Sequence, residues 1–171
     1  LAKNSMEFFC LFGAAAALGA ILVPVNWRLA PDEIAFILKD SDPKVIFSDQ
    51  EHGGTIIGLK EKLPRVAQYC SLGPGDSDFR GFDTLTAPSG DFTPPREVRS
   101  EDGFVIIYTA AVAGRPRGAL LSHGNVLCSS MHFGYSMKVT HDDVLLNFLP
   151  FFHVGGLFMA ATSFLAGALN L

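Results

Sequence analysis

Cysteine is scarce in this sequence of 171 residues, which contains only Cys10, Cys70 and Cys128. The three lie far apart, so no C-x-x-C pair can begin a zinc site, and an odd count argues against a closed disulfide framework. A reducing, cytoplasmic setting is therefore expected, with each thiol buried as a small hydrophobe. No metal site is expected either, because His141-Asp142-Asp143 before a strand reads as a solvated turn.

An excess of positive charge is also missing. The chain has 13 Lys and Arg against 17 Asp and Glu, a formal net charge of −4, and its basic residues are scattered. This pattern gives no electrostatic footprint for nucleic acid, so nucleic acid is not expected as a partner. With 49% hydrophobic and 18% charged residues, the composition is that of a globular chain with a sizeable core.

Uninterrupted hydrophobic runs of membrane-spanning length are lacking as well. Residues 8–25 and 154–171 carry no charge, but glycines and Pro24 punctuate the first run, and glycine, Thr162, Ser163 and Asn170 dilute the second. Each reads as a buried helix followed by a short strand, so no membrane span is expected. The alternative hypothesis is that the chain is an unrelated membrane protein, and it predicts that the chain partitions into detergent.

Helical and strand patterns alternate along the chain. Helices are predicted from Asn4 or Ser5 to Leu18, from Pro31 onward, over 55–63 and over 125–137, and strands over 21–25, 45–47, 66–69, 104–107, 119–121 and 144–149. This rhythm predicts an α/β fold with a largely parallel sheet and flanking helices.

A segment rich in Gly, Pro, Ser and Asp divides the pattern. We expect residues 1–72 to form a first αβ sub-structure and residues 103–171 a second. Residues 73–102 between them are expected to be a linker or surface excursion, because long loops are uncommon inside compact domains.

The most informative stretch is 108–118, Y-T-A-A-V-A-G-R-P-R-G, a charged loop held between two predicted strands. Such a loop suits an anion, since backbone N–H groups and guanidinium groups converge there. It resembles the phosphate-binding loop of the adenylate-forming family, the acyl-CoA synthetases and AMP-binding ligases, whose pattern is Y-T-S-G-T-T-G-x-P-K-G. The resemblance implies a nucleotide site made of Thr109, Gly114, Arg115, Pro116, Arg117 and Gly118.

The middle of this loop departs from the family pattern. Ala110, Ala111, Val112 and Ala113 replace Ser, Gly, Thr and Thr, which removes three hydroxyl donors. A hydrogen bond to a charged group contributes about 1.5 to 3 kcal/mol, so the loss bears on affinity. Arg117 keeps the charge of the family's lysine and can bind phosphate bidentately. Two interpretations of the arginines stay open, an anion clamp and a solvated charged turn.

Residues 149–156, L-P-F-F-H-V-G-G, resemble a second motif of the family, L-P-x-F-H-x-x-G. This resemblance implies that His153 and Gly155 border the acyl or carboxylate pocket. The alternative for His153 is a histidine bonded within a tight strand-to-helix turn, and His123 is expected to help cap a helix. A third resemblance, over 19–26 and Asp32-Glu33, follows the family's early helix, strand and helix in order.

Together the three motifs imply a part of an ATP-dependent acyl-CoA synthetase, an acid–thiol ligase. The family activates a carboxylate with ATP and Mg to an acyl adenylate and passes the acyl group to CoA, in reactions that include fatty acid metabolism. Its later motifs have no counterpart here, so the chain is expected to be an internal fragment of the large N-terminal domain, inactive without the remainder of the parent chain. No catalytic residue is assigned. The alternative is a non-catalytic relative that serves as a binding or scaffold module.

Overall fold

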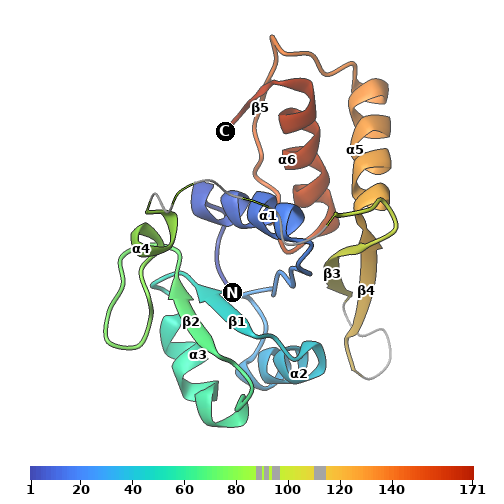
Figure 1. Ribbon diagram of the computed structural model, residues 1–171. Coiled ribbons are helices and arrows are strands. Elements are labelled where there is room, and N and C mark those ends of the chain that lie inside the picture. Colours follow the sequence, from blue (N-terminus) through green and yellow to red (C-terminus); the bar gives the residue numbers. More distant parts are fainter. Residues whose placement is uncertain (88–89, 91–92, 94–96, 110–114) are drawn as a thin grey trace. The chain divides into compact units, whose positions relative to one another are not determined.

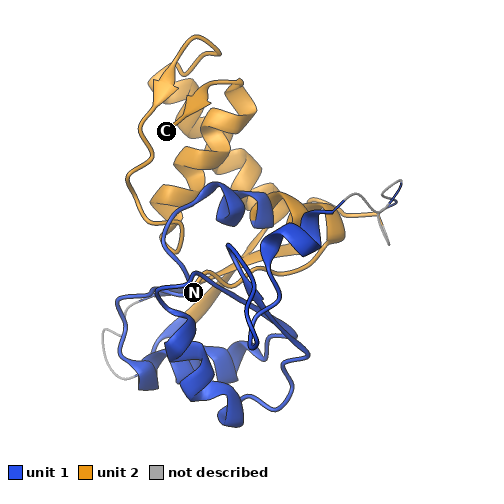
Figure 2. Cartoon of the chain, turned by 90° about the vertical axis from the view of Figure 1, so that its left-hand side faces the viewer, with its two compact units in different colours: residues 1–11, 25–94, 108–117 blue, residues 12–24, 95–107, 118–171 orange. Residues whose placement is uncertain are grey.

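The computed structural model describes residues 1–171 except 88–89, 91–92, 94–96 and 110–114 (Figure 1). The chain forms two compact units, each built from three segments (Figure 2). Unit 1 comprises residues 1–11, 25–94 and 108–117, and unit 2 comprises residues 12–24, 95–107 and 118–171. The expected division into 1–72, 73–102 and 103–171 is a division along the sequence, which these contact-defined units do not test, and it stays a prediction.

Helices and short strands alternate along most of the chain. The helices are α1 (Met6–Leu18), α2 (Pro31–Ser41), α3 (Gly53–Leu59), the 3₁₀ turn η1 (Lys60–Lys62), α4 (Phe82–Thr86), α5 (His123–Met137) and α6 (Val154–Ala166). The strands are β1 (Val45–Ser48), β2 (Gln68–Ser71), β3 (Gly103–Thr109), β4 (Arg117–Ser122), β5 (Val144–Leu145) and β6 (Leu169–Asn170).

In unit 1, β1 and β2 pair in parallel and α2 and α3 bury one face each. Helix α2 begins at Pro31, whose fixed φ suits the first helical position, and the Glu33 carboxylate accepts a hydrogen bond from the Ala30 N–H at 3.0 Å. The helix ends at Asp42, which adopts φ 45° and donates its N–H to the Leu38 carbonyl. The buried side chains of the two helices are Ile34, Ala35, Ile37, Leu38, Ile56 and Leu59.

In unit 2, α5 and α6 pack against each other (Figure 1). Ser122 and Asn125 form a capping box at the start of α5, since each side chain accepts a hydrogen bond from the other's backbone N–H, at 3.1 and 3.0 Å. Strands β3 and β4 pair, β5 and β6 pair in parallel, and β3 buries Phe104, Val105 and Ile107.

The α/β class is confirmed, and the β1–β2 and β5–β6 pairings are parallel as expected. Among the described residues, however, the strands form three two-stranded sheets instead of one wider sheet. The strand expected over 21–25 is reduced to one parallel bridge between Leu22 and Val105, because Pro24 lacks the N–H that would extend the ladder. The strand expected over 144–149 covers only Val144–Leu145, since its partner β6 is equally short.

Two further expectations can be compared with the structure. Cys70 is buried, but Cys10 and Cys128 are exposed, so the prediction that all three thiols are buried is wrong. Both lie on helices, off the faces buried through Phe8, Phe12 and Val126. Within the described part of the chain, no helix is both long and apolar enough to cross a bilayer, and α1 and α6 have 13 residues each.

Candidate functional site

The base of the charged loop lies where β3 ends and β4 begins. Thr109, the last residue of β3, donates its hydroxyl to the carbonyl oxygen of Arg117, the first residue of β4, at 3.4 Å. This long hydrogen bond joins the two ends of the loop. Gly114 and the residues 110–113 that depart from the family pattern lie outside the described residues.

Tyr108 fixes the start of the loop to α2. Its hydroxyl donates to the Oδ2 atom of Asp40 at 2.6 Å, a short bond of the kind that a charged acceptor makes. Burial raises the pKa of the Tyr108 phenol well above its usual range, and the hydrogen bond to the Asp40 carboxylate adds to the rise. The phenol therefore stays protonated and remains a donor at physiological pH.

Arg115 fixes the far side of the loop to the same helix. Its guanidinium carbon lies 5.4 Å from the centre of the Phe36 ring, within the range of a cation–π interaction. Arg115 and Pro116 also line an open pocket of about 600 Å³, together with Asp32, Glu33, Ala35, Phe36, Lys39 and Lys62. The pocket combines three cations with two carboxylates.

The charges around the loop bear on what it can hold. Arg115, Arg117 and Gly118 are all exposed, and Arg115 also faces an aromatic ring and shares its pocket with Asp32 and Glu33. An exposed guanidinium group at the base of a loop can bind a phosphate oxygen pair. The exposed guanidinium groups of Arg115 and Arg117 are thus among the described side chains that can bind such a pair, whereas the Thr109 hydroxyl already donates to the Arg117 carbonyl oxygen.

The second motif forms a tight turn in unit 2 that leads into α6. His153 caps the helix: its Nδ1 atom accepts a hydrogen bond from the Gly155 N–H at 3.1 Å, and its own N–H donates to the Pro150 carbonyl at 3.0 Å. The imidazole is exposed. The bonded-turn geometry considered for His153 is thus present.

His123 begins α5 without supplying its cap. Ser122 makes the capping bond, and the His123 ring stacks on Phe104 with centroids 4.6 Å apart and planes inclined by 20°. The expected capping role is therefore wrong, because the hydroxyl one residue earlier is better placed to reach the Asn125 N–H.

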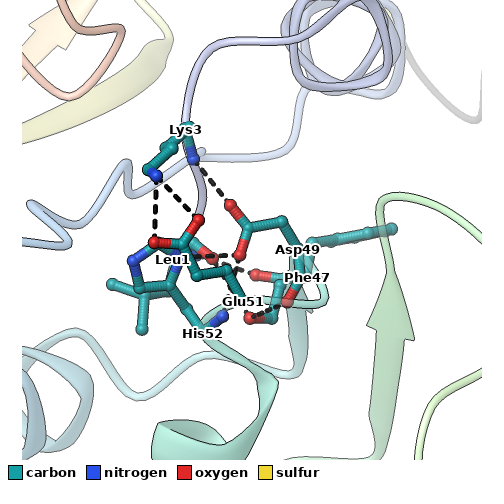
Figure 3. Close-up of polar contacts among 7 residues, drawn as sticks. Leu1, Lys3, Phe47, Asp49, Glu51 and His52 are labelled. Carbon is teal, nitrogen blue, oxygen red and sulfur yellow. Dashed lines mark hydrogen bonds and ion pairs between the residues drawn. The ribbon is translucent and has the colours of Figure 1, made fainter.

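A polar cluster in unit 1 was not predicted from the sequence. The Asp49 carboxylate accepts from the backbone N–H groups of Lys3 and His52, both at 2.9 Å, and lies 2.6 Å from His52 Nδ1 (Figure 3). Trp27 covers the cluster, with its ring centroid 5.6 Å from that of His52 and with Lys3 and Arg28 over it. Asp49 precedes α3, so an Asx-type turn was the available signal. The cluster ties the start of the chain to the end of β1.

In the described ranges, no three side chains of His, Cys, Asp or Glu lie close enough together to hold a metal ion. His141 Nε2 and Asp142 Oδ1 are 3.3 Å apart, but both side chains are about four-fifths exposed, at 78% and 84%. This agrees with the solvated turn expected there.

The fold, the loop and the turn define a class of protein. The family model described as AMP-binding enzyme matches residues 1–171, so the chain belongs to the family of AMP-binding enzymes.

Its relatives include CoA ligases. The chain is 34% identical to an indoleacetate–CoA ligase of Aromatoleum aromaticum and 35% identical to the long-chain-fatty-acid–CoA ligase FadD13 of Mycobacterium tuberculosis, over 92% of its own length in each case. A crystal structure of a protein from Rhodopseudomonas palustris matches 99% of the chain with a TM-score of 0.92 and 41% identity. The chain spans 31% and 30% of the two ligases and 42% of that crystallised chain.

Proposed function

We propose that the chain is part of an ATP-dependent acyl-CoA synthetase, an acid–thiol ligase that activates a carboxylate to an acyl adenylate and transfers the acyl group to CoA. The observation that carries the proposal is the loop of residues 108–118, with its base joined through Thr109 and Arg117 and with an exposed guanidinium group. The CoA ligases among the relatives support it.

In this proposal Thr109, Gly114, Arg115, Pro116, Arg117 and Gly118 form the nucleotide site. Arg117 neutralises phosphate charge, and Thr109 keeps the two strand ends together. The contribution of such a loop is electrostatic and positional, because it holds the phosphates where negative charge develops. Magnesium would enter with the nucleotide, and the described residues offer it no carboxylate cluster of their own.

His153 and Gly155 are proposed to border the carboxylate pocket. The cap holds the His153 ring in one orientation, since Nδ1 is engaged by the Gly155 N–H. A fixed ring with Nε2 exposed can orient a polar group of the substrate. The acyl substrate, a role in fatty acid metabolism and a cytoplasmic location belong to the same proposal.

The test uses the full-length parent protein. Saturable binding of Mg-ATP in calorimetry, followed by carboxylate-dependent ATP–pyrophosphate exchange, is expected. We expect the isolated 171-residue chain to show no exchange, because it spans less than a third of its ligase relatives. Full-length protein that neither binds Mg-ATP nor exchanges pyrophosphate would refute the ligase function.

The second candidate is a non-catalytic relative that acts as a binding or scaffold module. It is favoured by Ala110, Ala111, Val112 and Ala113 in place of the family's polar residues, and by the attachment of Arg115 to Phe36. The calorimetric titration separates the two candidates, since this one predicts no heat from Mg-ATP.

A further inference from the structure

Helix α2 presents one face to the charged loop. Asp32, Phe36 and Asp40 are spaced by four residues, so they lie above one another on the same side of the helix. The buried side chains Ile34, Ile37 and Leu38 occupy the opposite side, which packs into the core of unit 1. The face with Phe36 is therefore available to hold another element.

Both sides of the loop contact this face. Tyr108, just before residues 110–114, donates to Asp40 at 2.6 Å. Arg115, just after them, lies over Phe36 at 5.4 Å. These four residues all belong to unit 1, and the two contacts are one helical turn apart.

Each contact joins a half-buried aromatic side chain, Tyr108 or Phe36, to an exposed charged residue, Asp40 or Arg115. Tyr108 is partly buried and its pKa is raised, so the phenol makes this bond at every physiological pH. The Arg115 charge is directed to an aromatic face and to a pocket that also holds Asp32 and Glu33. Arg115, although exposed, therefore serves attachment of the loop, and Arg117 is the second exposed guanidinium group.

We propose that Asp40 and Phe36 are positioning residues that dock the two sides of the phosphate-binding loop on α2. Residues such as Tyr108 and Arg115 that are held in place before a ligand arrives avoid part of the ordering cost of binding. This matters here because the loop has lost three hydroxyl donors relative to the family pattern. The nature of the bound anion rests on the proposed function, whereas the docking does not.

The experiment compares wild-type full-length protein with Asp40→Asn, Tyr108→Phe, Phe36→Leu and the double variant Tyr108→Phe/Asp40→Asn. Tyr69→Phe is the matched control, because it also removes a phenol hydroxyl from unit 1 but lies on β2. Hydrogen–deuterium exchange is measured without nucleotide on peptides covering residues 108–118 and α3. Mg-ATP affinity and the KM values for ATP and carboxylate are then measured.

We expect faster exchange over 108–118 in the three single variants, with α3 and the Tyr69→Phe protein unchanged. The double variant should be no faster than Tyr108→Phe alone, since that variant already removes the bond, whereas the amide oxygen introduced by Asp40→Asn can still accept a weaker one. The dissociation constant and the KM for ATP should rise roughly five-fold, the lower end of site-to-site coupling, while the KM for carboxylate stays constant.

The outcomes distinguish the docking of the loop, its effect on ATP binding and the ligase function. Unchanged exchange of the loop in Asp40→Asn and Tyr108→Phe overturns the proposal whatever the affinity for ATP. Faster exchange with unaltered ATP affinity overturns the positioning role. Faster exchange in a protein whose wild type fails to bind Mg-ATP keeps the docking and rejects the ligase function, so the two failures are distinguishable.

Discussion

The hydroxyl of Thr162 on α6 donates a hydrogen bond of 3.0 Å to the carbonyl oxygen of Ser130 on α5, and both residues are buried. Replacing Thr162 by Val keeps the shape but leaves that carbonyl without the hydroxyl. We expect the free energy of unfolding to fall by about 1 to 2 kcal/mol, measured by urea denaturation.

Ser130→Ala is the matched control for this prediction. In the described part of the chain the Ser130 hydroxyl is buried without a hydrogen-bond partner, so its removal should leave stability unchanged or raise it. Equal stability of the Thr162→Val and wild-type proteins would show that the bond contributes nothing.

The two arginines of the loop should differ in their effect on ATP. Arg117→Ala is expected to weaken Mg-ATP binding by roughly ten-fold, the loss of about one charged hydrogen bond, because Arg117 is exposed at the base of the loop, where the chain enters β4. Arg115→Ala should have a smaller effect, since that guanidinium group lies over Phe36. Arg117→Lys, which restores the family's residue, should keep most of the affinity. A larger loss in Arg115→Ala would reverse the assignment.

Asp49 should stabilise unit 1 only above acidic pH. Burial acts to raise the pKa of its carboxyl, but the hydrogen bonds from Lys3 and His52 prevail and hold it below its ordinary value. A lowered pKa in the folded state stabilises above the unfolded pKa of about 4 and is lost as the pH falls through the folded value.

We therefore expect Asp49→Asn to reduce the free energy of unfolding by about 1 to 2 kcal/mol at pH 6, with the deficit shrinking toward pH 3. Urea denaturation across this range measures it. A deficit that is the same at every pH would mean that the charge of Asp49 plays no part.

Tyr108 should titrate at a higher pH than a tyrosine in water, because burial and the Asp40 carboxylate raise its pKa. Because its pKa is raised in the folded state, the phenol contributes stability that is present below about pH 10 and is lost as the pH rises through the folded value. Phenolate absorbance should show a delayed component in the wild type that is absent from Tyr108→Phe. In Asp40→Asn that component should titrate earlier, and an unchanged curve would argue that burial alone raises its pKa.

The capping and substrate roles proposed for His153 can be separated. His153→Ala removes the acceptor for the Gly155 N–H and should destabilise the protein by about 1 kcal/mol. His153→Asn can still cap the helix, so it should keep the stability of the wild type but raise the KM for carboxylate. Wild-type kinetics in His153→Asn would reduce His153 to a cap.

Local signals in the sequence were sufficient for most elements. Pro31 and the Glu33 carboxylate mark the start of α2, and Ser122 with Asn125 marks the start of α5. These features depend on contacts within one turn, which spacing along the chain can report. The ends of short strands were harder to predict, since they depend on the length of a partner strand that is distant in the sequence, as β5 and β6 show.

The attachment of the loop could not be predicted from the sequence. Tyr108 and Asp40 are 68 residues apart. Nothing in the sequence near Phe36 or Asp40 identifies the residue that each of them contacts. Periodicity assigns Phe36 to a helix face but does not say what covers it. The loop itself was visible from its residue pattern, whereas its support required the fold.

Gly156 occupies the first turn of α6, where a Cβ atom would lie 2.5 Å from the carbonyl oxygen of Leu149 and closer still to that of Pro150. Every other amino acid would force the backbone of the turn apart. The second glycine of this motif is thus required by geometry and carries no information about which acid is used. Variants that test the substrate pocket proposed at His153 should therefore leave Gly156 untouched and change residues around the exposed face of His153.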